Sequence, residues 1–220
     1  MKDIKIRKIE TDRLILKIPT MKEQKELWSI LKDEKVNRLY FPTPDRIFIK
    51  YNLAKESVED LIEARKIFQA QLDDWERQEA FYEKKINSIH NGDDSNKFTW
   101  SIFLKSGEVI GQMTVQPSDF SEGNPAIRDV GWFINPIHHR KGYASEAAKA
   151  ILDFMFNEVE IDKIITSAAN VNIGSWRIME KLGFKFTKNK PSTYLDENNN
   201  LLESSCYEIT REEYVKLLRR

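Results

Sequence analysis

Short runs rich in apolar and aromatic residues mark the middle of the chain, and these runs predict β-strands. Two of them, 98–104 and 109–115, are joined by the polar turn Lys105-Ser106-Gly107-Glu108. Runs of this length that meet at a glycine-containing turn are typical of a β-hairpin. A further run, 127–134, ends at Asn135-Pro136 and predicts a third strand.

The second half of the chain alternates between helical and strand patterns. Ala147, Ile151 and Phe154 share one face of a helix that we expect to end at about Glu158. Thr210 is followed by Glu213 at the spacing of a capping box, which predicts a terminal helix. The other elements expected here are strands at 163–169, 184–188 and 204–209 and a short helix at 173–182.

The N-terminal part predicts one strand and then mostly helix. The strand covers 9–18, and Thr20 is placed to cap a helix from about Lys22 to Leu31. An irregular aromatic loop is expected over 36–44, which holds two prolines. From Arg46 to Asn91 there is neither glycine nor proline, and apolar residues recur at three- and four-residue steps. This pattern predicts one long helix with a single break near 78–80.

This order of elements is that of a mixed α/β protein whose sheet begins with a meander. No linker rich in proline, glycine or serine divides the chain. We therefore expect a single domain over 1–220, with a helical insertion at about 46–96.

Charge and composition narrow the classes of partner. Lysine plus arginine and aspartate plus glutamate both number 35, so nothing in the balance calls for nucleic acid or a membrane surface. With one cysteine and three histidines, neither an internal disulfide nor a metal site is expected. No segment approaches about 18 apolar residues, and the N-terminus has no apolar run. We expect a soluble cytoplasmic protein.

The segment His139-Arg140-Lys141-Gly142-Tyr143-Ala144 carries the clearest chemical signal, because it runs directly into a predicted helix. The first backbone N–H groups of a helix lack intrahelical partners and bind anions. Gly142 lets a ligand approach the backbone, and Arg140 and Lys141 add positive charge. A Walker loop and a dinucleotide fingerprint both require more glycines. The segment therefore predicts a phosphate-binding turn of another design.

Two segments together resemble the GNAT superfamily, the Gcn5-related N-acetyltransferases. Residues 139–144 are similar to the family's coenzyme A turn, with His139 where Arg or Gln is usual. Residues 172–184, which end in Glu-Lys-Leu-Gly-Phe, are similar to a second family segment. The resemblance implies a mixed, mostly antiparallel twisted sheet flanked by helices.

Further segments at 11–16, 129–136 and 141–147 resemble the Rim-type acetyltransferases, which modify the N-termini of ribosomal proteins. In all, the resemblance covers roughly 9–45 and 98–215. The insertion at about 46–96 is longer than we expect for the family.

The resemblance implies acetyl-CoA as the acetyl donor, a primary amine as the acceptor and no metal. The acceptor is then a protein N-terminus or a similar amine. Two alternatives stay open: a small-molecule amine such as an antibiotic or polyamine, and a coenzyme A-binding sensor without catalysis. The coenzyme-binding residues implied are Phe133, Ile134, Asn135, His139, Arg140, Lys141, Gly142, Tyr143, Ala144, Ser145, Asn172 and Ser175.

Asp129 and Ser175 are the candidate catalytic residues. At pH 7 about one α-amino group in ten is neutral, against about one lysine side chain in 2,500, so the amine needs a general base. Asp129 stands where many family members carry glutamate; the alternative is a carboxylate paired with Arg128 or a lysine. Met179 occupies the position of the usual tyrosine, which leaves Ser175 to protonate the leaving thiolate. The alternative is a hydroxyl that bonds its own helix backbone.

Other groups have expected roles in acetyl transfer. Backbone N–H groups near Phe133–Asn135 are expected to stabilise the developing oxyanion. The inserted helix has three interpretations: a lid over the acceptor, a homodimer surface that uses Phe68, Leu72 and Trp75, or a helix packed on its own sheet. The aromatic residues expected to line the acceptor site, with core packing as the alternative, are Tyr40, Phe41, Trp100 and Trp132.

Overall fold

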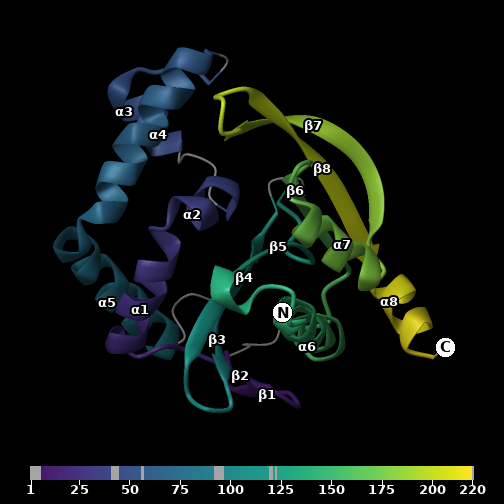
Figure 1. Cartoon of the computed structure of the whole chain (residues 1–220). Helices are drawn as coiled ribbons and strands as arrows, with labels where there is room; N and C mark the ends of the chain where they lie inside the picture. Colours follow the sequence, from purple (N-terminus) through teal and green to yellow (C-terminus); the bar gives the residue numbers. More distant parts are fainter. Residues whose placement is uncertain are drawn as a thin grey trace.

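A single mixed sheet organises the chain (Figure 1). The computed structural model describes residues 6–40, 45–55, 57–91, 97–118, 121 and 123–219. Within them the strand order is β1-β2-β3-β4-β5-β6-β8-β7, and only the β5–β6 pair is parallel. The strands are β1 (Ile9–Glu10), β2 (Leu14–Lys17), β3 (Phe98–Leu104), β4 (Val109–Pro117), β5 (Ile127–Ile134), β6 (Lys163–Ala169), β7 (Lys185–Leu195) and β8 (Leu201–Thr210).

The sheet splits between its two parallel strands. β5 and β6 pair at only two positions, Ile127 with Lys163 and Arg128 with Ile164, although both strands continue beyond them. The Thr166 hydroxyl donates to the Val130 carbonyl oxygen at 2.7 Å across the widening gap. Beyond this hydrogen bond β5 and β6 are no longer paired with each other, and the gap between them widens toward their C-terminal ends, from which the chain continues to α6 and α7.

Two groups of helices cover opposite faces of the sheet (Figure 1). On one face, α6 (Tyr143–Asn157), α7 (Ile173–Lys181) and α8 (Arg211–Leu218) pack over a core that includes Trp100, Ile151 and Phe154. The other face carries a second core, which joins Phe103 and Phe133 of the sheet to the N-terminal helices. Those helices are α1 (Met21–Leu31), α2 (Glu34–Tyr40), α3 (Asp45–Tyr51), α4 (Val58–Asp73) and α5 (Trp75–Asn91).

Several predicted elements are confirmed, among them the strands at 98–104, 127–134 and 163–169 and the Thr20-capped helix. Others were wrong in extent. The strand expected over 9–18 is two strands, because a turn in which Thr11 N–H bonds the Leu14 carbonyl folds it back on itself. The loop expected over 36–44 begins as α2, and Phe41–Pro44 lie outside the described residues.

The segment expected as a helical insertion, 46–96, contains α3, α4 and α5. The long helix predicted there has its expected break, which lies between α4 and α5, and α3 is an additional helix. α4 ends at Asp73, and its C-cap residue Asp74 has a non-helical ψ of 84°. The Asp74 side chain accepts a hydrogen bond from the Arg77 N–H at 3.0 Å and so starts α5 in the manner of an N-cap. The break therefore comes four residues before the expected 78–80.

The inserted helices pack within this chain. Phe68 and Leu72 are buried in the second core, and the Trp28 indole donates to the Leu72 carbonyl oxygen at 2.9 Å. The Trp28 ring also meets Trp75 and Tyr82, with centroids 6.1 and 5.5 Å away. Phe68 and Leu72 are therefore covered within the chain and are not exposed to a second subunit, whereas Trp75 is half-buried.

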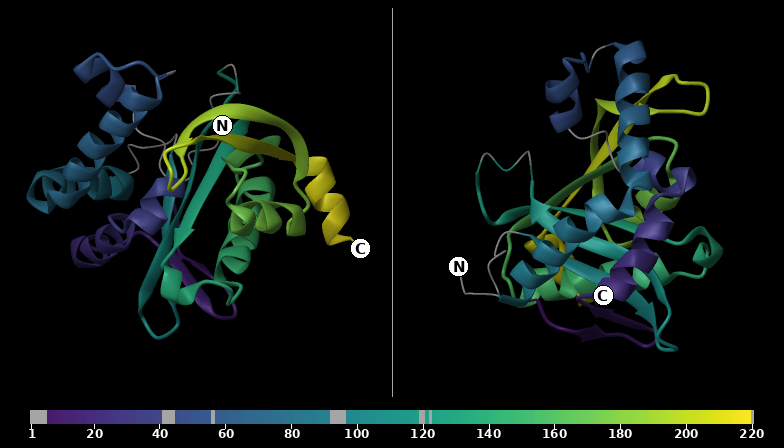
Figure 2. Two further views of the ribbon diagram at one scale, coloured as in Figure 1. Left: turned by 45° about the horizontal axis from the view of Figure 1, so that its top comes forward. Right: turned by 90° about the vertical axis from the view of Figure 1, so that its left-hand side faces the viewer.

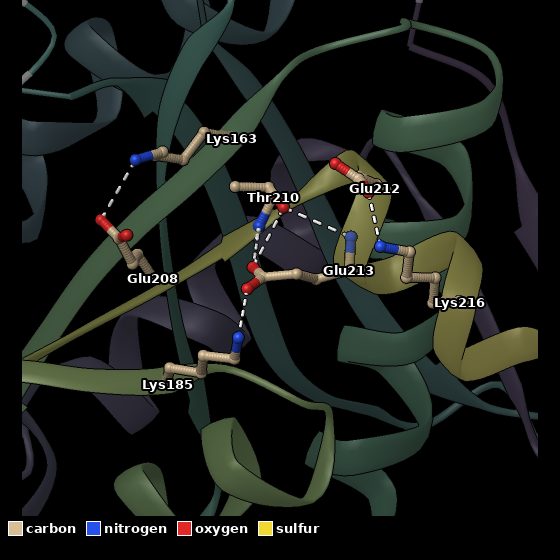
Figure 3. Close-up of polar contacts among 7 residues, drawn as sticks. All are labelled: Lys163, Lys185, Glu208, Thr210, Glu212, Glu213 and Lys216. Carbon is tan, nitrogen blue, oxygen red and sulfur yellow. Dashed lines mark hydrogen bonds and ion pairs between the residues drawn. The ribbon is translucent and has the colours of Figure 1, made fainter.

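The C-terminal hairpin is longer than predicted and spans the molecule (Figure 2). At its base, α8 begins with the predicted capping box of Thr210 and Glu213, and Lys185 of β7 pairs with the same Glu213 (Figure 3). At its tip, Arg38 of α2 pairs with Glu197 at 3.0 Å. The hairpin thus reaches from α8 to the helices on the opposite face of the sheet.

Candidate active site

A cleft of about 1880 Å³ follows the split between β5 and β6. The start of α6 and the start of α7 line one part of it, and α2, α5 and β7 line another. The cleft therefore joins the two faces of the sheet. The strands β5 and β6 end at the split, and the helices α6 and α7 begin there.

The turn at 139–144 has the backbone of an anion cradle. Arg140 and Gly142 both have positive φ, 61° and 81°, and Gly142 is the N-cap of α6 without a side-chain cap. Gly142, Tyr143, Ala144 and Ser145 line the cleft, so the first-turn N–H groups of α6 lie at its wall. His139 and Arg140 line the cleft as well, whereas Lys141 is not among the lining residues.

An N-terminal clamp holds this turn. Glu146 of α6 accepts hydrogen bonds from the Thr11 hydroxyl at 2.6 Å and from the Arg13 backbone N–H at 3.0 Å and Nε at 2.6 Å. Arg13 also donates to the Lys141 carbonyl oxygen at 2.9 Å and lies over the Tyr143 ring. Burial acts to raise the pKa of Glu146, but the bonds from Thr11 and Arg13 outweigh it and lower that pKa. The clamp thus joins the segment 11–16 to the segment 141–147.

The free edge of β5 supplies backbone groups to the cleft. The Val130 and Ile134 carbonyls point to the split, since they accept from Thr166 and from Nε2 of His139, the latter at 2.8 Å. Strand alternation directs the N–H groups of Trp132 and Ile134 to the same edge. Asn135 differs from these residues, because its N–H donates to the Ile110 carbonyl oxygen at 2.7 Å and its side-chain oxygen accepts from the Ile137 N–H.

Asp129 faces the side of the sheet that carries the inserted helices. Strand alternation places it with Phe133, whereas Val130 and Ile134 belong to the core under α6. Arg128 points to that opposite side, so it is not the partner of Asp129. Burial raises the pKa of the Asp129 carboxyl, and hydrogen bonds from Thr166 and Gln116 and the charge of Lys190 only partly oppose it.

Polar side chains that the sequence did not single out surround this carboxyl. Gln116 lies directly opposite Asp129 on β4, and Thr114 lies opposite Gly131. Tyr40 hydrogen-bonds Thr114, and burial raises the pKa of its phenol above the usual range. Burial and the charge of Asp129 likewise raise the pKa of Tyr194 to about 12. Alternating polar residues on β4 are a signal for such a wall, but nothing local in the sequence brings Tyr194 here.

The start of α7 closes the other side of the split. The Asn172 side chain accepts from the Ser175 N–H at 3.3 Å, so Asn172 is the N-cap. Ser175 lies in the first turn and, like the buried Met179, lines the cleft. The expected thiolate donor therefore has access to the same space as Asp129 and the α6 turn.

The aromatic residues expected at the acceptor site do not all lie at the cleft. Tyr40 lines the cleft and contacts the Phe133 ring at a centroid distance of 4.9 Å, and Trp132 lines it too. The prediction for Trp100 was wrong: its ring is fully buried against Phe154, and its indole donates to the Arg7 carbonyl oxygen. Phe41 lies outside the described residues.

Comparison with known proteins identifies this arrangement. A family model described as an acetyltransferase (GNAT) domain matches residues 13–185. The chain belongs to the GNAT acetyltransferase family. The N-acetyltransferase YnaD of Bacillus subtilis, described as uncharacterized, is 34% identical over 102 residues, which cover 46% of this chain and 57% of YnaD. The chain spans about half the length of the curated relatives it matches.

Solved structures share the GNAT fold. A GNAT-family acetyltransferase from Bacillus anthracis superposes with a TM-score of 0.62 at 21% identity, over 94% of this chain and 100% of that one. RimJ of Mycobacterium smegmatis, in complex with CoA-disulfide, superposes with a TM-score of 0.62 at 16% identity, over 91% and 83%. At these identities the likeness shows the fold.

The GNAT fold uses acetyl-CoA, and this cleft fits such a ligand. Gly142 leaves the start of α6 open, Arg140 offers positive charge, and the N–H groups of β5 line the gap. Within the described part of the chain, no three histidine, cysteine or carboxylate side chains gather as a metal site would need. Nor does any helix there combine the length and hydropathy of a membrane span.

Proposed function

We propose that this GNAT domain transfers the acetyl group of acetyl-CoA to a primary amine, with an N-terminal α-amine as the preferred acceptor. The observation that carries the proposal is the position of Asp129. This carboxylate stands where the cleft passes from the α6 face of the sheet to the face of the inserted helices. A donor held at α6 and an acceptor under the inserted helices would meet beside it.

Each residue has a stated task in this proposal. The start of α6 holds the pyrophosphate, and the Arg13–Glu146 clamp keeps that turn in shape. The N–H groups of Trp132 and Ile134 donate to the acetyl oxygen as negative charge develops on it. Asp129 accepts the proton that the amine releases, directly or through a water molecule.

The raised pKa of Asp129 suits that task, because a carboxylate with an ordinary pKa is a weak base at neutral pH. In this proposal Ser175 protonates the departing sulfur, because Met179 stands where a tyrosine is usual, and the Ser175 hydroxyl regains a proton from water. An α-amine is the acceptor that this site can use most readily, since more of it is neutral at pH 7 than of a lysine side chain.

The test separates binding from chemistry. Acetyl-CoA at 100 times its dissociation constant should stabilise the protein by about 2.7 kcal/mol. Thiol release should then depend on an added peptide with a free N-terminus, and Asp129→Asn should slow it by about 10²- to 10⁴-fold. Glu208→Gln, a β8 variant of a carboxylate outside the cleft, is the control. Stabilisation without thiol release on any amine would show a sensor instead of an enzyme.

A further inference from the structure

The strand β7 carries a bulge where it lines the cleft. β7 and β8 are paired at Pro191 and again at Leu195, but between these two positions β7 has three residues, 192–194, and β8 has one, Leu202. Residues 190–194 all line the cleft. Bulges of this kind occur beside active sites, where they change the direction of a side chain.

The bulge turns Tyr194 toward Asp129. Leu195 is buried in the second core, and regular alternation would direct its neighbour Tyr194 to the opposite face of the sheet. Tyr194 instead lies within electrostatic reach of Asp129 and of Tyr40, which both belong to the face of the inserted helices. The Ser192 hydroxyl fixes this arrangement, because it donates to a β8 carbonyl oxygen at 2.6 Å and accepts from the Tyr194 N–H at 3.2 Å.

The hydroxyl of Tyr194 differs from that of Tyr40. Tyr40 hydrogen-bonds Thr114. The Tyr194 hydroxyl forms no hydrogen bond with another residue in the described part of the chain, although the residue is half-buried. Burial and the charge of Asp129 raise the pKa of Tyr194 to about 12, so its phenol is neutral at physiological pH. A neutral phenol both accepts and donates hydrogen bonds.

Asp129 keeps acceptor capacity beside this phenol. A carboxylate has about four acceptor positions, and the hydrogen bonds from Thr166 and Gln116 use two of them. We propose that the Tyr194 hydroxyl accepts one N–H of the acceptor amine while the Asp129 carboxylate accepts the other, so that the site is specific for primary amines. This inference rests on the proposed function and names a residue that selects its acceptor.

Two N–H acceptors fix the direction of the attacking lone pair. A neutral primary amine has two hydrogens and one lone pair, and holding both hydrogens aims the lone pair at the acetyl carbon. As the N–C bond forms and the C–S bond breaks, one hydrogen passes to Asp129 as a proton. The other remains in the product amide and keeps its bond to Tyr194. A secondary amine has one hydrogen, which Asp129 must take, and its additional carbon would lie against the Tyr194 hydroxyl.

Acceptors that differ by one methyl group test the proposal. The probes are the amidated peptides Ala-Gly-Gly, Ser-Gly-Gly and Met-Gly-Gly, each with and without a methyl group on the terminal nitrogen. Thiol release is measured with saturating acetyl-CoA and equal concentrations of neutral amine. We expect kcat/KM of the wild type to be at least about ten-fold higher for the unmethylated member of each pair.

Matched variants locate the effect. Tyr194→Phe keeps the ring and should lower kcat/KM about ten-fold for the unmethylated peptides only, with the KM for acetyl-CoA unchanged. Tyr207→Phe is the control, because Tyr207 is a buried tyrosine of β8 outside the cleft whose hydroxyl bonds Glu180; it should preserve the ratio. Ser192→Ala should lower the ratio as Tyr194→Phe does, and Ser192→Thr, which keeps a hydroxyl, should restore it.

Three results would overturn the inference. They are equal turnover of methylated and unmethylated peptides by the wild type, an equal loss on both by Tyr194→Phe, and an equal loss of selectivity in Tyr194→Phe and Tyr207→Phe. If Tyr194→Phe does not fold, the same ratio in the two Ser192 variants decides. Each of these results leaves the proposed acetyl transfer intact. Absence of turnover on every amine, in a protein that acetyl-CoA still stabilises, would instead refute the proposed function and this inference with it.

Discussion

Glu146→Gln is the sharpest perturbation of the coenzyme side, because one carboxylate joins the N-terminal strands to the phosphate turn. Its side chain is 18% exposed and accepts from Thr11 and from two groups of Arg13. Glutamine keeps the shape and one acceptor oxygen but loses the charge. The Arg13 guanidinium, which also holds the Lys141 carbonyl, then loses its ion pair.

The magnitude follows from the exposure of each partner. A hydrogen bond to a charged group contributes about 1.5–3 kcal/mol, against about 0.5–1.5 for a neutral pair, so each inner bond loses about 1 kcal/mol. The Arg13 side chain is 49% exposed, which limits its share to the surface value of about 0–1 kcal/mol. We expect a loss of about 1–2 kcal/mol. In a domain of this size that lowers Tm by roughly 2–8 °C.

Calorimetry of unfolding and of acetyl-CoA binding checks both consequences. The dissociation constant should rise about three- to ten-fold, because the turn must now be ordered on binding. Glu212→Gln is the matched control: Glu212 is also a first-turn glutamate with an ion pair, but its pair with Lys216 is exposed and lies on α8 (Figure 3). Equal effects of the two variants on Tm and on binding would refute the clamp.

The pH dependence of this difference has a definite sign. Folding lowers the pKa of Glu146. Its contribution to stability is therefore complete above about pH 5 and is lost as the pH falls through the lowered pKa. The gap in Tm between wild type and Glu146→Gln should close in acid. A gap that stays constant between neutral pH and about pH 3 would assign the effect to shape instead of charge.

Three further predictions concern single positions. Gly142→Ala and Gly107→Ala both place a side chain at positive φ, at a cost of about 1–2 kcal/mol, but only the first should weaken acetyl-CoA binding. Gly183→Ala should cost more than Gly107→Ala in denaturant unfolding, because its Cβ would meet Leu217 Cδ1 at 2.1 Å whereas that of Gly107 meets open space. Since folding raises the pKa of Asp129, turnover should increase as the pH rises through that pKa, and wild type should lose stability relative to Asp129→Asn over the same rise, starting at about pH 4.

The sequence predicts elements well where a local signal marks each end. The Thr20 and Thr210 caps and the strand before Asn135-Pro136 are of this kind. The turn between β1 and β2 contains neither glycine nor proline, so the sequence predicted one continuous strand through it. The prolines after Tyr40 were taken to make the whole segment irregular. A proline disfavours helix at the residue before it, and here α2 ends before that point.

The residues of the candidate site also fall into those that a local sequence pattern predicts and those that it does not. Gly142, Asn172 and Ser175 lie in continuous segments, and the structure brings all three to one cleft. The partners of Asp129 come from elements far apart in the chain, such as Tyr40 on α2 and Tyr194 on β7. The packing of the hairpin tip against α2 helps to place them together, and no local sequence pattern predicts that packing.

The alternation along β5 has a consequence for specificity. Neighbouring residues point to opposite faces, so Val130 and Ile134 belong to the core under α6, while Asp129 and Phe133 face the inserted helices. In the proposed function, donor and acceptor then reach the reaction centre from opposite faces and share few side chains. Substitutions at Lys85 or elsewhere on the inner wall of the insertion should change the KM for the amine and leave that for acetyl-CoA unchanged. The helices between 46 and 96 are thus where selection among amines is expected to act.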